Sequence, residues 1–292
     1  MPQSAVSTLA KVRTVRAGLV GRGILLSRTP AMHEAEGRAH GMDYDYRLFD
    51  LDDQTLADLP LSAIIESAEA EGLAGLNVTY PFKFAVIEFL HELSDNARAV
   101  GAVNTIVFRD GRRIGHNTDL WGFAEAFRRG MAGVSLEKVL LIGAGGAGVA
   151  VSRALLSLGV ARLWIFEKDE QRATALVRVL QDRFGPDRAV AAENLIRVAP
   201  LLNGVVNATP VGMEKCPGSP YPAMLLRADL WVADIVYFPL ETELLAAARA
   251  AGCRVLPGSD MAVFQAARAF NLFTGESPDP ARMRRTFEAL GP

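Results

Sequence analysis

The chain has 292 residues, of which 50% are hydrophobic, and a formal net charge of −2. This length exceeds what one ordinary hydrophobic core uses, so we expect two domains. The weak net charge, without any long run of Lys or Arg, disfavours nucleic acid and anionic membrane as partners and favours small-molecule chemistry.

Cysteine and histidine usage points to a reduced compartment without a metal site. The two cysteines, Cys216 and Cys253, form no C-x-x-C motif and read as ordinary thiols. The four histidines lack paired metal-ligand spacing, so no metal is expected. The first dozen residues read as a frayed terminus and not as a signal peptide. We therefore expect a cytoplasmic protein, a monomer or a homodimer, whose partners are small molecules.

The first half of the chain alternates between strand and helix patterns. Strands are predicted at 15–21, 44–49 and 75–78, and helices at 30–35, 61–71 and 84–90. Asp110-Gly111, between the segments 102–108 and 113–117, predicts an antiparallel hairpin. A long helix from Asp119 to Arg129 then leads into the second half, and we place the domain boundary there.

The second half begins with a glycine turn between a strand and a helix. The apolar run 139–142 precedes Gly143-Ala144-Gly145-Gly146-Ala147-Gly148. In such a unit the glycines permit the tight turn, the approach of a pyrophosphate and close helix packing. The next strand, 162–166, ends in Glu167, whose carboxylate can accept both ribose hydroxyls of NAD. The unit predicts dinucleotide binding; a glycine-rich turn that serves only close packing is the alternative.

The remaining patterns complete an α/β fold with two domains. Further strands are predicted at 204–207 and 230–236, and helices from Met261 to the end with a break at 275–280. We expect an N-terminal α/β substrate-binding catalytic domain and a Rossmann-type domain with a doubly wound parallel sheet. The first covers residues 14–119 and is completed by C-terminal helices at 263–292; the second, the NAD(P)-binding domain, covers 120–262.

Polar residues gather at the strand ends and helix starts of the first domain, where α/β sites usually lie. They are Ser27, Thr29, Asn77, Thr79, Lys83, Asn104 and Asp119. Taken singly, each has an ordinary explanation: a cap or turn residue, or, for Lys83, a solvated surface lysine. Together with a nucleotide-binding domain they suit hydride chemistry on a polyhydroxylated substrate.

Ordered motifs along the chain resemble the shikimate dehydrogenase family from about residue 18 to the end. They are the segments 77–83, 101–105, 115–119, the glycine turn, 207–212 and 265–275. The resemblance implies a substrate domain and a Rossmann domain with a cleft between them. It also implies that Lys83 and Asp119 form the catalytic pair.

The same resemblance assigns the binding residues. Ser27 and Thr29 are expected to hold a substrate carboxylate. The residues expected at the ring hydroxyls are Asn77, Thr79, Asn104 and Gln265, with Tyr237 as a further pocket residue. The residues expected at the cofactor are Gly143, Ala144, Gly145, Gly146, Ala147, Gly148, Glu167, Lys168, Arg172, Thr209, Val211, Val236, Gly258 and Met261.

Two departures from the commonest biosynthetic pattern indicate a branch of the family. Thr29 stands where biosynthetic members usually have a second serine, which adds a methyl group to the carboxylate pocket. Glu167 stands where they usually have Asn followed by an arginine that grips the NADP 2′-phosphate. Both features resemble the quinate/shikimate dehydrogenase branch, which prefers NAD, although Lys168 and Arg172 leave NADP possible.

The resemblance therefore implies a reversible, NAD-dependent hydride transfer at a ring hydroxyl of quinate or shikimate, giving 3-dehydroquinate or 3-dehydroshikimate. Lys83 is expected to act as the acid/base and Asp119 to orient it; the two could also share the proton. Two alternatives stay open: an NADP-dependent shikimate dehydrogenase of aromatic amino acid biosynthesis, and a catalytically silent NAD-binding sensor.

Overall fold

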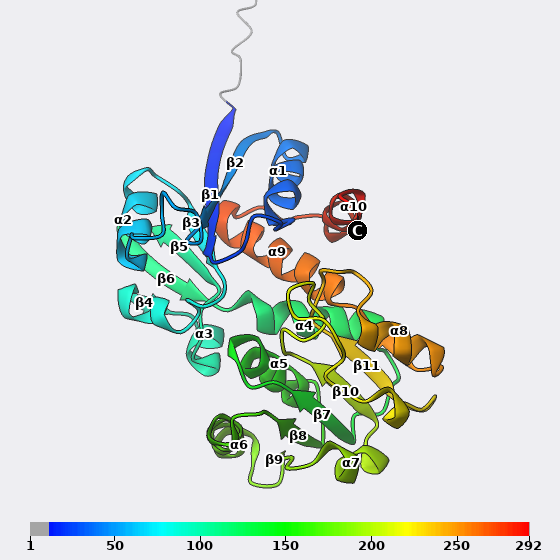
Figure 1. Cartoon of the computed structure of the whole chain (residues 1–292). Coiled ribbons are helices and arrows are strands. Elements are labelled where there is room, and N and C mark those ends of the chain that lie inside the picture. Colours follow the sequence, from blue (N-terminus) through cyan, green and yellow to red (C-terminus); the bar gives the residue numbers. More distant parts are fainter. Residues whose placement is uncertain (1–11, 292) are drawn as a thin grey trace, which may run out of the picture.

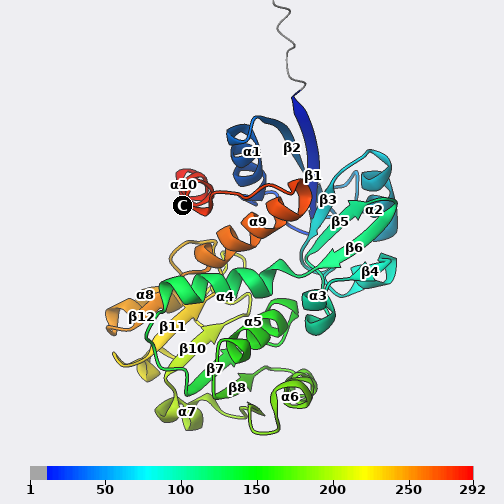
Figure 2. The ribbon, with the colours of Figure 1, turned by 180° about the vertical axis from the view of Figure 1, so that it is seen from behind.

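A computed structural model describes residues 12–291, so the expected frayed terminus at residues 1–11 lies outside the described range. Two α/β bodies, each built on its own sheet, are joined by two long helices that lie side by side (Figures 1 and 2). These connecting helices are α4 (Thr118–Gly130) and α9 (Gly258–Thr274). The α/β architecture expected from the sequence is confirmed.

The first body contains a mixed six-stranded sheet of order β2-β1-β3-β5-β6-β4. Its strands are β1 (Arg13–Gly21), β2 (Met42–Asp50), β3 (Gly75–Val78), β4 (Glu92–Leu93), β5 (Thr105–Arg109) and β6 (Arg112–His116). Strand β1 is parallel to β2 and β3, whereas β5 is antiparallel to β3 and β6. The predicted hairpin joins β5 to β6, and both of its turn residues, Asp110 and Gly111, have positive φ (52° and 67°). Positive φ at both positions is what a two-residue hairpin turn requires.

Helices cover both faces of this first sheet. They are α1 (Thr29–Ala39), α2 (Leu61–Ala70) and α3 (Asp95–Val100), with a 3₁₀ turn, η1 (Ala85–Phe89), where the sequence predicted a helix at 84–90. Side chains of α2 pack on one face, and Phe270 and Phe273 of α9 pack on the other with Tyr44 and Tyr46 of β2. The first sheet therefore packs against α9, a helix from near the C-terminal end of the chain.

The second body contains an all-parallel sheet of order β12-β11-β10-β7-β8-β9. Its strands are β7 (Lys138–Ile142), β8 (Arg162–Phe166), β9 (Ala189–Ala191), β10 (Gly204–Asn207), β11 (Trp231–Asp234) and β12 (Arg254–Leu256). This order is that of a doubly wound dinucleotide-binding fold, in which the order reverses between β7 and β10. Ligands of such folds bind at the carboxyl ends of the strands at that reversal.

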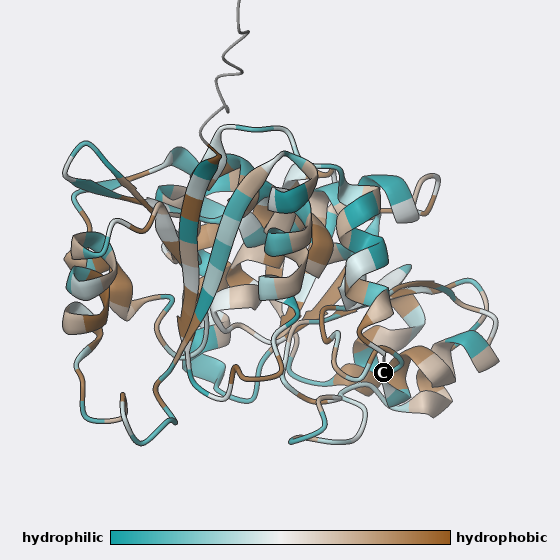
Figure 3. Ribbon diagram, turned by 90° about the horizontal axis from the view of Figure 1, so that it is seen from above, coloured by the Kyte–Doolittle hydropathy of each residue, from teal (hydrophilic) through white to brown (hydrophobic). Residues whose placement is uncertain are grey.

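Both faces of the second sheet are also covered. The helices are α5 (Gly146–Ser157), α6 (Glu170–Phe184), α7 (Leu195–Val198) and α8 (Glu243–Ala250), with 3₁₀ turns η2 (Ala199–Leu201) and η3 (Ala223–Leu225). Side chains of α4, α5 and α6 form the core on one face, and those of α7 and α8 form it on the other. Hydrophobic and hydrophilic residues alternate along the helices in Figure 3, as expected for helices with one buried side.

The C-terminal helices return to the first body, as expected. Helix α9 begins at Gly258, earlier than the predicted Met261. A Cβ built on Gly258 would lie 2.4 Å from the Val236 carbonyl oxygen, so only glycine lets the helix start so close to the segment that follows β11. Helix α10 (Pro280–Ala289) packs against Met32 of α1 through Met283 and Phe287.

No helix within residues 12–291 is both long enough and apolar enough to cross a membrane. Across the same range, no group of three or more His, Cys, Asp or Glu side chains is arranged to hold a metal ion.

Candidate active site

The predicted catalytic pair is in direct contact. Lys83 Nζ donates to Asp119 Oδ2 over 2.6 Å, although the residues are 36 positions apart in the chain. The side chains are 18% and 8% exposed, respectively. Charge-assisted hydrogen bonds shielded from water are among the strongest in proteins. The ordinary explanation for Lys83, a solvated surface lysine, is therefore excluded.

Local structure holds both members of the pair in place. Lys83 lies in the turn after β3, and its carbonyl accepts from the backbone N–H of Val103 over 2.8 Å. Asp119 lies in the first turn of α4, but the cap of that helix is Asn117, whose side chain accepts from the N–H of Leu120. Because Asn117 caps the helix, the Asp119 carboxylate is available to Lys83.

Asn77 is held by side chains from neighbouring strands. Its Oδ1 accepts from the Tyr46 hydroxyl over 2.7 Å, and its Nδ2 donates to Thr105 Oγ1 over 2.9 Å. Burial raises the pKa of Tyr46 well above its usual value, and the neighbouring Tyr44 and Tyr237 phenols add to this shift, so the Tyr46 hydroxyl stays protonated and donates. The Asn77 amide is thus fixed in orientation before any substrate arrives.

A second amide, Asn104, is tied to the start of α4. Its Oδ1 accepts from the backbone N–H of Thr118 over 2.7 Å, and its Nδ2 donates to Thr118 Oγ1 over 2.9 Å. Thr118 Oγ1 in turn donates to Gln265 Oε1 on α9 over 3.4 Å. A Cβ on Gly122 would lie 2.8 Å from the Gln265 backbone nitrogen, so this glycine permits the close approach of α4 and α9. The structure thereby brings Asn104 and Gln265 together.

Tyr237, which follows β11, reaches the catalytic pair from the second body. Tyr237 is 37% exposed, and partial loss of hydration together with the nearby Asp119 carboxylate raises the pKa of its phenol. Arg28 opposes that shift. Tyr237 is also close enough to Tyr46 to influence its ionisation. These electrostatic influences indicate that Tyr237 lies near both Tyr46, the partner of Asn77, and Asp119.

The remaining predicted substrate residues lie at the ends of β1 and β3 and at the start of α1. Ser27 Oγ donates to Thr29 Oγ1 over 3.2 Å and accepts from the Thr29 backbone N–H over 3.3 Å. Neither residue caps α1, because its N-cap is Arg28 and no side chain caps the helix. A Cβ on Gly21 would lie 2.4 Å from Thr79 Cγ2, so the end of β1 accommodates Thr79.

The glycine turn has the geometry of a pyrophosphate cradle. Gly143 has a φ of +103°, which favours glycine, and a Cβ on Gly148 would lie 2.2 Å from the Gly143 carbonyl oxygen. By contrast, a Cβ on Gly145 would have no atom within 4 Å, and no side chain caps the N-terminus of α5. Free N–H groups at this helix start, with open space before them, fit a dinucleotide phosphate.

Lys83, the predicted catalytic lysine, lies beside this cradle. A Cβ built on Gly146 would lie 3.5 Å from Lys83 Cδ and 3.6 Å from Phe84 Cε2. Val100 and Ala102 of the first body also pack against Ala150 of α5. The structure thus places an amine, paired with a carboxylate, between the polar pocket of the first body and the glycine turn of the second.

Glu167 lies at the end of β8 and already contacts the glycine turn. Its Oε2 accepts from the backbone N–H of Ala144 over 2.8 Å. Lys168 is exposed, and Arg172 is directed to Asp169 at 3.3 Å. A carboxylate is therefore the charged group held against the turn, in the position where an adenosine ribose would meet it.

The other predicted cofactor residues line the carboxyl ends of β10 and β11. The Thr209 N–H and hydroxyl both donate to Asn207 Oδ1, and Asn207 Nδ2 donates to the Val211 carbonyl oxygen over 2.9 Å. Val236 and Met261 are buried, at 6% and 8% exposure. These residues share the sheet edge with the glycine turn.

The sequence did not reveal several residues that orient the predicted site residues through hydrogen bonds. Tyr46, Thr105 and Thr118 orient the two asparagines, and Asp234 orients Asn207 by accepting from its Nδ2 over 2.9 Å. Burial raises the pKa of Asp234 to about 6. Thr105 and Thr118 are sequence neighbours of Asn104 and Asp119 within the quoted motifs, so their position in the chain could have indicated a role in the site. Tyr46 offered no such indication.

Comparisons with known proteins agree with this geometry. The family model for the shikimate dehydrogenase substrate binding domain matches residues 19–106, and that for the shikimate 5′-dehydrogenase C-terminal domain matches residues 258–286. The chain is 49% identical over 268 residues to a shikimate dehydrogenase (NADP(+)) of Streptomyces avermitilis, covering 91% of this chain and 92% of that protein. It is 45% identical over 276 residues to a quinate/shikimate dehydrogenase (NAD(+)) of Corynebacterium glutamicum, covering 94% and 98%.

Solved structures show the same likeness. A quinate dehydrogenase from Corynebacterium glutamicum in complex with NAD superposes with a TM-score of 0.89 at 43% identity, over 95% of this chain and 99% of that one. A shikimate 5-dehydrogenase from Thermus thermophilus in complex with NADP(H) and shikimate gives a TM-score of 0.82 at 36% identity, over 94% and 99%. Identity of this extent over nearly the whole chain establishes the relationship: the chain belongs to the shikimate dehydrogenase family, whose members are oxidoreductases acting on CH–OH groups.

Proposed function

We propose that this enzyme oxidises a ring hydroxyl of quinate or shikimate to the corresponding 3-dehydro ketone, reversibly and with NAD as the preferred cofactor. One observation carries the proposal. Lys83 pairs with Asp119 over 2.6 Å, while the stem of the same lysine lies 3.5 Å from where a Cβ of Gly146 would be. An acid/base pair therefore lies beside the predicted nicotinamide cofactor site, where hydride chemistry needs it.

The residues divide the work of binding. Ser27 and Thr29 take the substrate carboxylate, and the ring hydroxyls meet Asn77, Thr79, Asn104 and Gln265. Tyr237 is a further pocket residue. Because the amides of Asn77 and Asn104 are already oriented by hydrogen bonds of 2.7–2.9 Å, little side-chain entropy is lost when substrate binds. Preorganisation of this kind places the reacting C–H and O–H bonds in a fixed geometry.

The chemical step removes a hydride and a proton from one CH–OH group. A nicotinamide ring bound at the glycine turn would accept the hydride that leaves the C–H bond. Lys83, as the neutral amine, takes the hydroxyl proton and becomes an ammonium, and the electron pair of the O–H bond forms the second bond of the C=O group. Asp119 orients the Lys83 amine and accepts a hydrogen bond from a neighbouring substrate hydroxyl. In the reverse direction the Lys83 ammonium polarises the ketone and returns the proton.

Cofactor preference rests on Glu167. Its carboxylate points at the glycine turn, so it accepts the ribose hydroxyls of NAD and repels the 2′-phosphate of NADP. Relatives named for each cofactor have similar identity to this chain, 49% and 45%. The charge at this one position is what favours NAD here.

Glu167→Gln tests this assignment without altering side-chain size. We expect the Kd for NADP to fall at least about tenfold and the Kd for NAD to rise, measured by calorimetry. Glu170→Gln is the matched control, since it removes the same charge from the exposed first turn of α6. If both variants change the NAD to NADP ratio equally, Glu167 does not set the preference.

A catalytically silent NAD-binding sensor is the competing function. The retained contact between Lys83 and Asp119 argues against it, because a sensor has no use for an acid/base beside the cofactor. Turnover of quinate or shikimate, followed at the reduced-nicotinamide absorbance, decides between the two.

The proposal extends to domain roles and location. Residues 14–119 with 263–292 bind substrate and residues 120–262 bind NAD(P), because the carboxylate and hydroxyl ligands lie on the first body and the glycine turn on the second. The enzyme acts in the cytoplasm on small molecules. The free thiols of Cys216 and Cys253 support a reducing location.

A further inference from the structure

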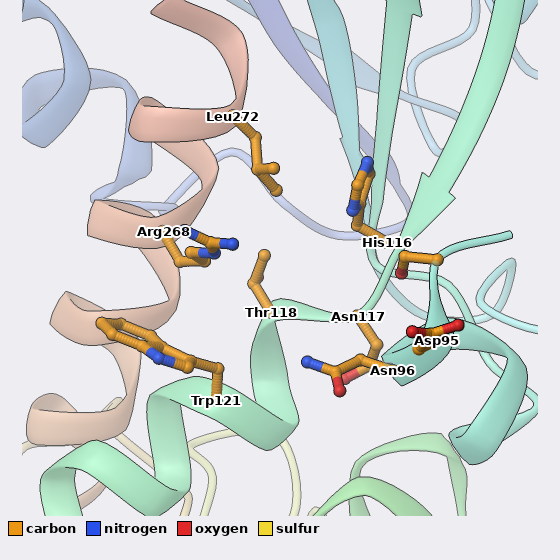
Figure 4. A pocket seen from close by; sticks show the side chains of 9 residues that line it. Asp95, Asn96, His116, Asn117, Thr118, Trp121, Arg268 and Leu272 are labelled. Carbon is orange, nitrogen blue, oxygen red and sulfur yellow. The ribbon is translucent and has the colours of Figure 1, made fainter. Parts of the chain in front are cut away.

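A cavity lies next to the predicted substrate residues without including them. It has a volume of about 260 Å³ and is bordered by the start of α3, the end of β6, the start of α4 and the middle of α9 (Figure 4). Thr118 forms the wall between this cavity and the predicted substrate pocket, since its hydroxyl contacts Asn104 and Gln265. None of the predicted substrate or cofactor residues lines the cavity.

The cavity offers a cation that is free to bind an anion. Arg268 is exposed, and its side chain donates to Asn271 Oδ1 over 2.9 Å. Within residues 12–291, no carboxylate lies within 4.0 Å of its guanidinium. Figure 4 shows the Arg268 side chain directed into the cavity, above Trp121 and opposite Asp95. An arginine in this position can take a carboxylate through two parallel hydrogen bonds.

The cavity also offers flat and apolar surface. Trp121 is half-buried, and its indole packs edge-on against Phe264 at a centroid distance of 6.3 Å and an angle of 77°, which fixes its orientation. Leu272 lies on α9 one turn beyond Arg268 and also lines the cavity. Indole and leucine surfaces suit a flat ring, since aromatic contacts stabilise beyond the area that they bury.

We propose that this cavity binds a small molecule that joins a carboxylate to a flat, apolar ring. The carboxylate contacts Arg268, and the ring lies against Trp121 and Leu272. A volume of about 260 Å³ is below the usual range for drug-sized ligands and suits a ligand with a single ring. Such chemistry occurs in aromatic acids and in aromatic amino acids, and only the latter could also place an ammonium near Asp95.

Calorimetric titration with 3-phenylpropanoate and with L-phenylalanine tests the site. We expect at least one probe to bind the wild-type enzyme and Arg268→Gln to raise its Kd at least about tenfold. Arg197→Gln, which removes an exposed arginine from α7, is the matched control and should leave that Kd unchanged. Because Arg268 is exposed, the variant should fold normally. The probe that binds more tightly identifies the source of the ligand.

Two results would overturn the proposal. One is the absence of binding by both probes up to about 10 mM. The other is equal binding by wild type, Arg268→Gln and Arg197→Gln, which would place the probe elsewhere, as in the carboxylate pocket of Ser27 and Thr29. Neither result depends on turnover, so a failure here is distinguishable from a failure of the proposed function.

Discussion

We expect removal of the Lys83 amine to slow the chemical step much more than it weakens substrate binding. Lys83→Ala deletes the group proposed to move the proton but leaves the residues proposed to hold the substrate, Asn77, Asn104 and Gln265, in their own hydrogen-bond network. If the amine acts mainly in the transition state, kcat falls far more than KM rises.

The size of the loss follows from the geometry of the pair. General acid–base catalysis by a positioned group contributes about 10²- to 10⁴-fold, or about 3–5 kcal/mol of barrier. Removing Lys83 also leaves the Asp119 carboxylate, which is 8% exposed, without its partner at 2.6 Å. That unpaired charge should lower the free energy of unfolding by about 1–3 kcal/mol, less than for a fully enclosed pair, because Lys83 retains 18% exposure to water.

Lys83→Gln distinguishes the two effects. Its amide can still donate to Asp119, so much of the stability should return, but it cannot accept the proton, so kcat should stay about 10²-fold or more below wild type. Lys138→Ala, at the exposed start of β7, is the control and should retain wild-type kcat and KM. Near-normal kcat in Lys83→Ala, or a large rise in KM alone, would refute the assignment of the proton to this amine.

Further predictions concern stability and specificity. Burial raises the pKa of Asp234 from 3.8 to about 6, so its neutral form stabilises the fold at low pH and that contribution is lost as the pH rises from about 4 to about 6. This change in pKa corresponds to about 3 kcal/mol. In urea unfolding, the free energy of unfolding of Asp234→Asn relative to wild type should therefore increase by up to about 3 kcal/mol between pH 4 and pH 7. A difference that stays constant with pH would contradict this. Tyr46→Phe removes the hydroxyl that donates to Asn77 and should raise KM by up to about tenfold. Tyr44→Phe is the control, since Tyr44 is also buried but does not bond to Asn77, and it should lower stability without changing KM. Equal KM values in the two variants would show that Tyr46 does not position Asn77. Thr29→Ser removes the extra methyl group and should shift the ratio of kcat/KM for quinate over shikimate toward shikimate by up to about tenfold; an unchanged ratio would show that this methyl group does not shape the pocket.

The sequence predicted the elements that are apolar runs between clear breaks and missed several whose local pattern is weak. The strands at 75–78 and 162–166 match their predicted bounds, because each is an apolar run between clear breaks. Strand β4, with two residues, and helix α3, with six, form because tertiary neighbours hold them, and local propensity cannot reveal that. Helix α8 was missed although Thr242 caps it.

The candidate site was also only partly predictable from the sequence. The resemblance named Lys83 and Asp119, and the structure brings them into contact. The support of Asn77 by Tyr46 could not be predicted, because β2 and β3 are not adjacent and the tyrosine reaches across β1 at Ala17. The register of the sheet, which the sequence does not state, decides that contact.

The most direct test of the proposed function is a comparison of kcat/KM across four pairs: quinate or shikimate, each with NAD or NADP. The charge of Glu167 and the methyl group of Thr29 predict that quinate with NAD has the highest value. Shikimate with NADP as the leading pair would contradict the account at both positions and indicate a biosynthetic enzyme.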